Sequence, residues 1–86
     1  MPEISHFFGI VIAMYYNDHR PPHFHASYGE HQAVVDVATG KILAGRLPSR
    51  AAALVEEWRQ RYKQQLSSNW ALSVARKPLE YIRPLE

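Results

Sequence analysis

The stretch "HFHASYGEHQAVVDVATG", residues 23–40, determines the fold expected for this chain. Apolar and polar residues alternate through its first six positions, which is the period of a half-buried β-strand. Gly29-Glu30 has the composition of a two-residue hairpin turn, and residues 31–39 form the next strand. Counting back from this turn gives three opposed pairs, namely Tyr28 with His31, His25 with Val34, and His23 with Asp36.

The residues before and after this hairpin predict further strands. The apolar run Phe7–Tyr16 is interpreted as one strand covered on both faces, because both of its alternating sets of side chains are apolar. Residues 17–22 form a loop, since two consecutive prolines fix φ and supply no N–H. Thr39-Gly40 marks a second turn before the strand "KILAGRL" at residues 41–47. About four strands in meander order are therefore expected.

After Pro48 the apolar residues change to helical spacing, at Ala51, Leu54, Trp58, Tyr62, Leu66, Trp70 and Val74. A helix is expected from near Ser49, a candidate N-cap, to at least Leu66, and it ends before Pro78. Its continuation through residues 67–69 stays open, because serine and asparagine are weak helix formers.

The sequence thus predicts one α+β domain over residues 1–86, a small antiparallel β-meander packed by a long C-terminal helix. The sheet half spans residues 1–47, the helical half residues 48–77 and a tail residues 78–86. Eighty-six residues suit one domain, and 47% hydrophobic residues are enough for a core.

Composition also limits the classes of function. The absence of cysteine leaves only His, Asp, Glu or Tyr as ligands for a metal. The run at residues 7–16 has no basic flank before it and is too short to span a bilayer, so no membrane contact and a cytoplasmic location are expected. A net charge of +2 is compatible with RNA, DNA or an acidic protein as a partner, and also with an ordinary solvated surface.

One helix can cover only one face of the sheet, although the first predicted strand is apolar on both faces. The second face is expected to be covered by the C-terminal tail, by a second copy of the chain or by a different protein. A homo-oligomer or a heterocomplex is therefore expected.

Three of the five histidines lie within residues 18–26. The predicted register places His23 and His25 on one sheet face with Asp36, which is the composition of a two-histidine, one-carboxylate site for a divalent metal. Asp18 or His19 would supply a further ligand. Without metal, Asp36 would orient His23 as a general base, with His25 beside it. The simplest alternative is that both histidines form the solvent side of an amphipathic strand.

Two arginines form a second candidate site. Arg46 and Arg50 flank the expected start of the helix, where free N–H groups favour anions, so "GRLPSR" can hold a phosphate. Salt bridges to nearby carboxylates are the alternative role for these side chains.

The motif "NDHRPPHFHA" at residues 17–26 occurs together with an opening Pro-Glu-Ile, the segment Gly-Arg-Leu-Pro at residues 45–48 and a tryptophan-bearing helix. In these features the chain resembles the small bacterial family catalogued as domain of unknown function 4160, from Met1 to about Trp70. The resemblance adds Asn17 to Asp18 and His19 as candidate binding positions. It also implies a gene setting beside a second short protein, as in a toxin–antitoxin pair. Many relatives have a basic residue where this chain has Ala13, which weakens any anion-binding role there.

The function expected is that of one half of a two-protein, toxin–antitoxin-like module, with a histidine-bearing face that contacts nucleic acid or binds a divalent metal. The alternative is a non-enzymatic interaction module that binds a cognate protein or a second copy of itself. Whether the chain is an enzyme stays open at this point.

Overall fold

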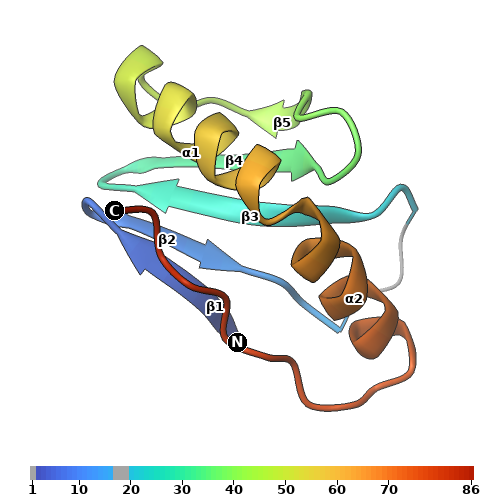
Figure 1. Cartoon of the computed structure of the whole chain (residues 1–86). Helices are drawn as coiled ribbons and strands as arrows, with labels where there is room; N and C mark the ends of the chain where they lie inside the picture. The colour runs from blue at the N-terminus through green and yellow to red at the C-terminus, as the bar shows by residue number, and fades with distance from the viewer. Residues whose placement is uncertain (1, 17–19) are drawn as a thin grey trace.

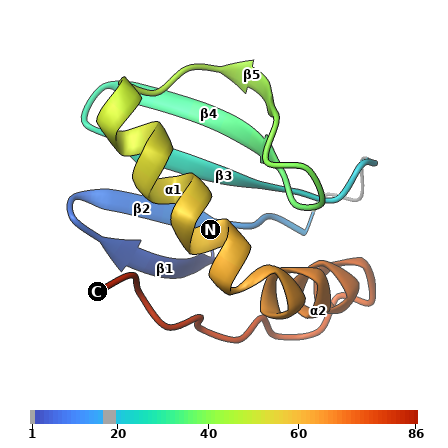
Figure 2. The same cartoon turned by 45° about the horizontal axis from the view of Figure 1, so that its top comes forward.

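The computed structural model describes residues 2–16 and 20–86, and within them five antiparallel strands in meander order precede two helices (Figure 1). The elements are β1 (Glu3–Phe7), β2 (Ile10–Ala13), β3 (His23–Tyr28), β4 (His31–Asp36), β5 (Ile42–Gly45), α1 (Ser49–Arg61) and α2 (Lys63–Val74). Both helices lie on one face of the sheet, α1 across its strands and α2 beside the start of β3 (Figures 1 and 2). The α+β class and the meander are confirmed, with five strands instead of about four.

The hairpin of β3 and β4 has the predicted register. His23 pairs with Asp36, His25 with Val34 and Tyr28 with His31. Phe24 and Ala26 are buried toward the helices, and His23 and His25 alternate with them on the opposite side. The alternation of side chains and the Gly29-Glu30 turn were therefore sufficient to predict this hairpin.

The prediction of one strand over residues 7–16 is wrong, because the chain reverses direction at Phe8-Gly9 and forms a hairpin of β1 and β2. Both turn residues have positive φ, 51° for Phe8 and 80° for Gly9. Glycine adopts this conformation readily, whereas phenylalanine seldom does, so the turn lacks its usual composition. A Cβ on Gly9 would lie 3.3 Å from the Tyr28 ring, which packs over this turn.

The prediction of one continuous helix from near Ser49 to at least Leu66 is also wrong. Ser49 is the first helical residue and Pro48 occupies the N-cap position, with no side-chain capping bond. The helix breaks at Tyr62 (φ −117°, ψ 28°), and α2 then continues through residues 67–69 to Val74. Asn69 is tolerated in α2 because its side chain accepts a hydrogen bond from the Glu80 N–H and donates one to the Glu80 carbonyl.

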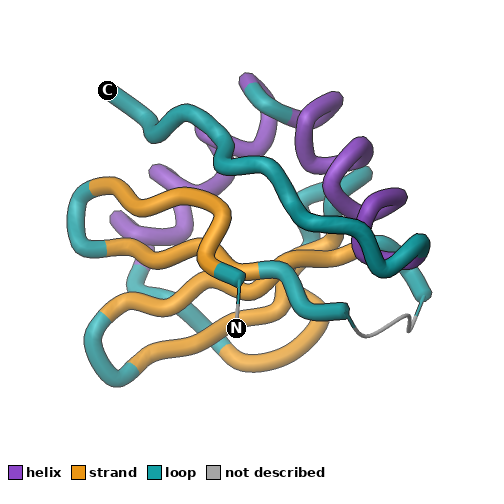
Figure 3. Tube along the Cα trace, turned by 90° about the horizontal axis from the view of Figure 1, so that it is seen from below, coloured by secondary structure: helices purple, strands orange, loops and turns teal. Residues whose placement is uncertain are grey.

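The core lies between the sheet and the helices and is centred on Trp58. Its ring lies 5.4 Å from that of Phe7 and 5.7 Å from that of Phe24, centroid to centroid. The Trp58 indole N–H donates to the Arg83 carbonyl, and the Ile82 N–H donates to the Ile4 carbonyl. The C-terminal tail therefore closes the layer beside β1, on the helix side of the sheet (Figure 3).

Arg59 joins α1 to the turn between β4 and β5. Its buried guanidinium donates to the Val37 carbonyl at 2.9 Å and the Ala38 carbonyl at 3.2 Å, and forms two hydrogen bonds with Glu56. Gly40 lies against this ion pair, and a Cβ there would collide with Glu56 Oε1 and Arg59 Nε. The pair thus fixes the turn between β4 and β5 against the helix layer.

Candidate functional site

The sheet face opposite the helices is covered by no described segment of the chain (Figure 3). Its middle bears Val11, Ala13, His25 and Val34, and an open hollow lies on it, lined by His25, Gln32, Ala33, Val34, Ala44 and Gly45. Of the three expected covers for this face, the tail is excluded, because it packs beside β1 on the other side.

No helix in the described ranges is both long and apolar enough to cross a membrane.

Four ring side chains contact one another in series at the end of the sheet where β3 begins. The Tyr15 and His25 ring centroids are 4.5 Å apart, those of His25 and His23 are 5.5 Å apart, and those of His23 and Trp70 are 5.0 Å apart. We call Tyr15, His25, His23 and Trp70 the ring row. It extends from the chain just after β2, across β3, to α2, with three half-buried rings and a buried indole.

One backbone contact determines which nitrogen of the neutral His23 ring carries the proton. Its Nδ1 lies 2.8 Å from the carbonyl oxygen of Pro21. A carbonyl oxygen only accepts hydrogen bonds, so Nδ1 carries the proton in this contact. In the neutral ring Nε2 is then unprotonated and can accept a hydrogen bond, take up a proton or bind a metal.

His25 is held in its neutral form. Burial lowers the pKa of His25 below its ordinary value of 6.5, and repulsion from His23 lowers it further. A neutral imidazole is the form that accepts a proton in general-base chemistry. It can also stack on another ring without the cost of removing water from a charge.

The carboxylate of Asp36 is used in the turn that follows β4. One oxygen, Oδ1, accepts hydrogen bonds from the Ala38 N–H at 2.8 Å and the Thr39 N–H at 3.0 Å. This is the side-chain pattern that stabilises tight turns. Asp36 is therefore opposite His23 in register, as predicted, while the Nδ1 of His23 is oriented by Pro21 instead.

Within residues 2–16 and 20–86, no group of three or more His, Asp or Glu side chains could hold a metal ion. The predicted metal and binding residues Asn17, Asp18 and His19 lie outside the described residues. What the described part offers a metal is the pair His23 and His25, with Asp36 engaged in its turn.

Arg46 and Arg50, the candidate anion-binding residues, are both exposed. Neither forms an ion pair within the described ranges, where the three ion pairs join His6 with Glu3, Arg59 with Glu56 and Arg61 with Glu57. The alternative that these two arginines bridge to nearby carboxylates is thus wrong for this part of the chain. Both guanidinium groups remain available to an external anion.

Sequence reasoning did not predict the contact of Trp70 with His23. It assigned Tyr15 to the first strand and also considered this ring for stacking on bases near the histidines. It assigned Trp70 to the core by its place on the helical stripe, and Trp70 is indeed buried there. Trp70 reaches His23 because α2 turns away from α1 at Tyr62, and no Gly or Pro between residues 55 and 70 marks that break.

The fold and site define a class of small α+β protein, in which helices cover one face of a five-stranded meander and the other face carries a histidine pair. Residues 9–71 match the family model described as a domain of unknown function (DUF4160), and the chain belongs to that family. Neither a curated protein nor a solved structure shows a significant match to it.

Proposed function

We propose that this chain is one component of a two-protein, toxin–antitoxin-like module and that its open face binds single-stranded nucleic acid, RNA foremost. The observation that supports nucleic-acid binding is the ring row, in which Tyr15, His25 and His23 lie in series at one end of the uncovered sheet face and His23 contacts the buried Trp70 of α2. The pairing with a second protein is supported by the gene setting that the resemblance described above implies. The cytoplasmic location expected from the sequence stays a prediction.

Open sheets that expose rings are a recurrent way of binding single strands. Bases stack on aromatic and histidine side chains, and each stacked base contributes roughly 1–3 kcal/mol. The ring row offers Tyr15, His25 and His23 for this, and the backbone N–H and C=O groups of its strand are already used within the sheet. The net charge of +2 is favourable for phosphates, although it is small.

Direct contact is favoured over action through a divalent metal. One oxygen of the Asp36 carboxylate, Oδ1, accepts hydrogen bonds from two turn N–H groups, and the described residues hold no cluster of three ligands. The neighbouring imidazoles of His23 and His25 offer ring nitrogens that can accept hydrogen bonds from 2′-hydroxyl groups without a metal.

The test is the binding of a fluorescein-labelled, mixed-sequence RNA of about twelve nucleotides, a typical site size for such surfaces. Fluorescence anisotropy would be measured with untagged protein at two salt concentrations. We expect binding that weakens about tenfold or more in His25→Ala, which removes the central ring of the row. His31→Ala is the matched control, because His31 is exposed beside the Gly29-Glu30 turn and has no part in the row.

Equal affinity of the wild type, His25→Ala and His31→Ala would overturn the assignment of the face, and so would an absence of binding. Gel analysis of the same samples would show whether the RNA is also cut. Metal content by mass spectrometry, with His23→Ala/His25→Ala beside the wild type, tests the mode of action. Stoichiometric metal that is lost in the double variant would overturn direct contact.

A second candidate, the non-enzymatic interaction module, is favoured by one observation at the edge of the sheet. β5 is an edge strand, with no second strand partner among the described residues, and it exposes Ile42 and Leu43 by 38% and 41%. Exposed apolar edge strands pair readily with another chain. Under this function Leu43→Lys would dissociate a complex seen by light scattering, while RNA would not bind at all.

A further inference from the structure

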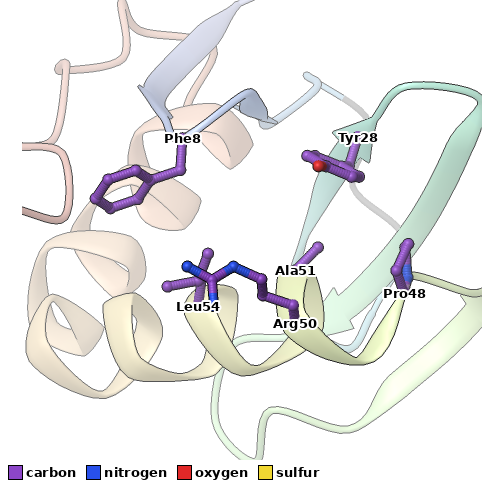
Figure 4. Close-up of a pocket in the computed structure, with 6 residues that line it drawn as sticks. All are labelled: Phe8, Tyr28, Pro48, Arg50, Ala51 and Leu54. Atoms are coloured by element: carbon purple, nitrogen blue, oxygen red, sulfur yellow. The ribbon is translucent and has the colours of Figure 1, made fainter.

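A hollow of about 150 Å³ lies at the end of the sheet remote from His23 (Figure 4). It opens between the β1–β2 turn, the end of β3 and the first turns of α1, and is lined by Phe8, Tyr28, Pro48, Arg50, Ala51 and Leu54. A cavity of about this volume accommodates a benzene-sized group, which matches a leucine or phenylalanine side chain.

Phe8 is unusual in both backbone and exposure. Its φ of 51° is one that asparagine or glycine adopts with less strain, and 61% of the residue is exposed. Its ring meets the buried Phe7 ring edge to face, with centroids 6.5 Å apart, and is otherwise little used by the core. It does supply one wall of the hollow, and exposed aromatic residues beside a pocket are typical of binding hot spots.

The polar groups at the rim of the hollow form no interaction with the described part of the chain. The Arg50 guanidinium forms no ion pair with any carboxylate in residues 2–16 and 20–86, and the Tyr28 hydroxyl has no hydrogen-bond partner in the same ranges. In Figure 4 the Arg50 side chain extends over Leu54 on the side of the hollow where Phe8 lies. A cationic fork therefore lies beside an apolar cavity.

The chemistry of this hollow favours a peptide over a nucleobase. The side chains of Pro48, Ala51 and Leu54 offer no hydrogen-bonding group, whereas a base edge would need several. An aliphatic or aromatic side chain needs none, and a guanidinium matches a carboxylate with two parallel hydrogen bonds.

We propose that this hollow docks an acidic segment of a partner protein, which inserts one leucine- or phenylalanine-sized side chain between Phe8 and Leu54 and places a neighbouring carboxylate on Arg50. The proposal rests on the pairing with a second protein proposed above and is independent of the ring row, which lies at the other end of β3.

The test is a titration of ¹⁵N-labelled protein with the acetylated, amidated pentapeptide Glu-Asp-Leu-Glu-Asp, followed by amide chemical shifts. We expect shifts concentrated at Phe8, Gly9, Tyr28 and Ala51, with affinity lower by about tenfold when the peptide leucine becomes alanine. A similar loss is expected when the four acids become their amides, because Arg50 then has no anion to bind. Shifts spread over the surface, or equal binding of all three peptides, would overturn the proposal.

Variants of the protein distinguish peptide binding in the hollow from non-specific attraction by the positive charge of the protein. Phe8→Asn is expected to lose peptide binding without lowering the melting temperature, since asparagine relieves the strain at this turn. Arg50→Gln is expected to weaken binding about fivefold or more, and Arg61→Gln, an equal loss of charge outside the hollow, to have little effect. Equal effects of the two arginine variants would contradict a built site.

The two proposals fail separately. If the peptide does not bind but RNA binding still depends on His25, only the proposal for the hollow is refuted. If the peptide binds as expected but RNA binding does not depend on His25, only the proposal for the ring row is refuted. Binding of the labelled RNA that is lost in Phe8→Asn would assign the hollow to nucleic acid and overturn the peptide.

Discussion

At the scale of single residues, His25 connects the open face to pH. Burial and the nearby His23 lower its pKa in the folded state, so between that pKa and 6.5 the unfolded chain binds more protons than the folded one. Stability is therefore expected to decrease as pH falls below about 6.5 and to be fully present above it.

Chemical denaturation at a series of pH values tests this expectation. The loss of stability below pH 6.5 should be smaller in His25→Gln and unchanged in His31→Gln. Glu56 does not interfere, because the Arg59 hydrogen bond lowers the pKa of Glu56 from 4.5, and its contribution is lost only in more acidic solution. An unchanged profile in His25→Gln would contradict the burial of this ring.

The backbone conformation of Phe8 costs the folded state free energy. A non-glycine residue with positive φ costs about 1–3 kcal/mol, and Phe8 recovers little of it by burial because 61% of it is exposed. Phe8→Asn is therefore expected to raise the free energy of unfolding by about 0.5–1 kcal/mol, as measured by urea denaturation. A decrease of about 1 kcal/mol or more would show that the ring supports the fold.

The residue scale also shows what the sequence could reveal about the site. His23 and His25 were predicted to share a face, because alternation fixes the side of each residue in a strand. The occupation of Asp36 by its own turn was not predicted, since any carboxylate beside a turn can bind either backbone N–H groups or an external ligand.

At the scale of elements, Arg59 holds the turn between β4 and β5 on α1. Replacing it with methionine keeps the volume but leaves the Val37 and Ala38 carbonyls without their donor. We expect Arg59→Met to lower the free energy of unfolding by about 2–3 kcal/mol in urea denaturation. Arg61→Met, which removes an exposed ion pair of 3.7 Å with Glu57, is the control and should change it by at most about 0.5 kcal/mol. Equal effects of Arg59→Met and Arg61→Met would show that Arg59 does not hold this turn on α1.

The elements differ in how far the sequence predicted them. β3 and β4 followed from alternation and a glycine turn, whereas the turn at Phe8-Gly9 was hidden by a phenylalanine in a conformation that it seldom adopts. The break at Tyr62 has no local signal and depends on how α2 packs on the start of β3. Contacts that join distant segments, such as Trp70 with His23, cannot be read from local periodicity.

At the scale of the whole molecule, two surfaces are left for other molecules, and they lie at opposite ends of β3. The ring row lies where β3 begins, at His23. The hollow lined by Phe8 and Arg50 lies where β3 ends, at Tyr28. The rings of Tyr15, His25 and His23 lie on the sheet face that the helices and the tail leave open (Figure 3), whereas the hollow opens on the helix side, between α1 and the β1–β2 turn. The two proposed binding surfaces therefore do not overlap.

The most direct test of the central claim is an amide chemical-shift map of ¹⁵N-labelled, untagged protein with an unlabelled single-stranded RNA of about twelve nucleotides. If the ring row binds the RNA, we expect shifts at Ala13, Tyr15, His23, His25 and Val34, with none of similar size along α1. Shifts confined to α1 or to β5, or none at RNA concentrations in the millimolar range, would contradict it.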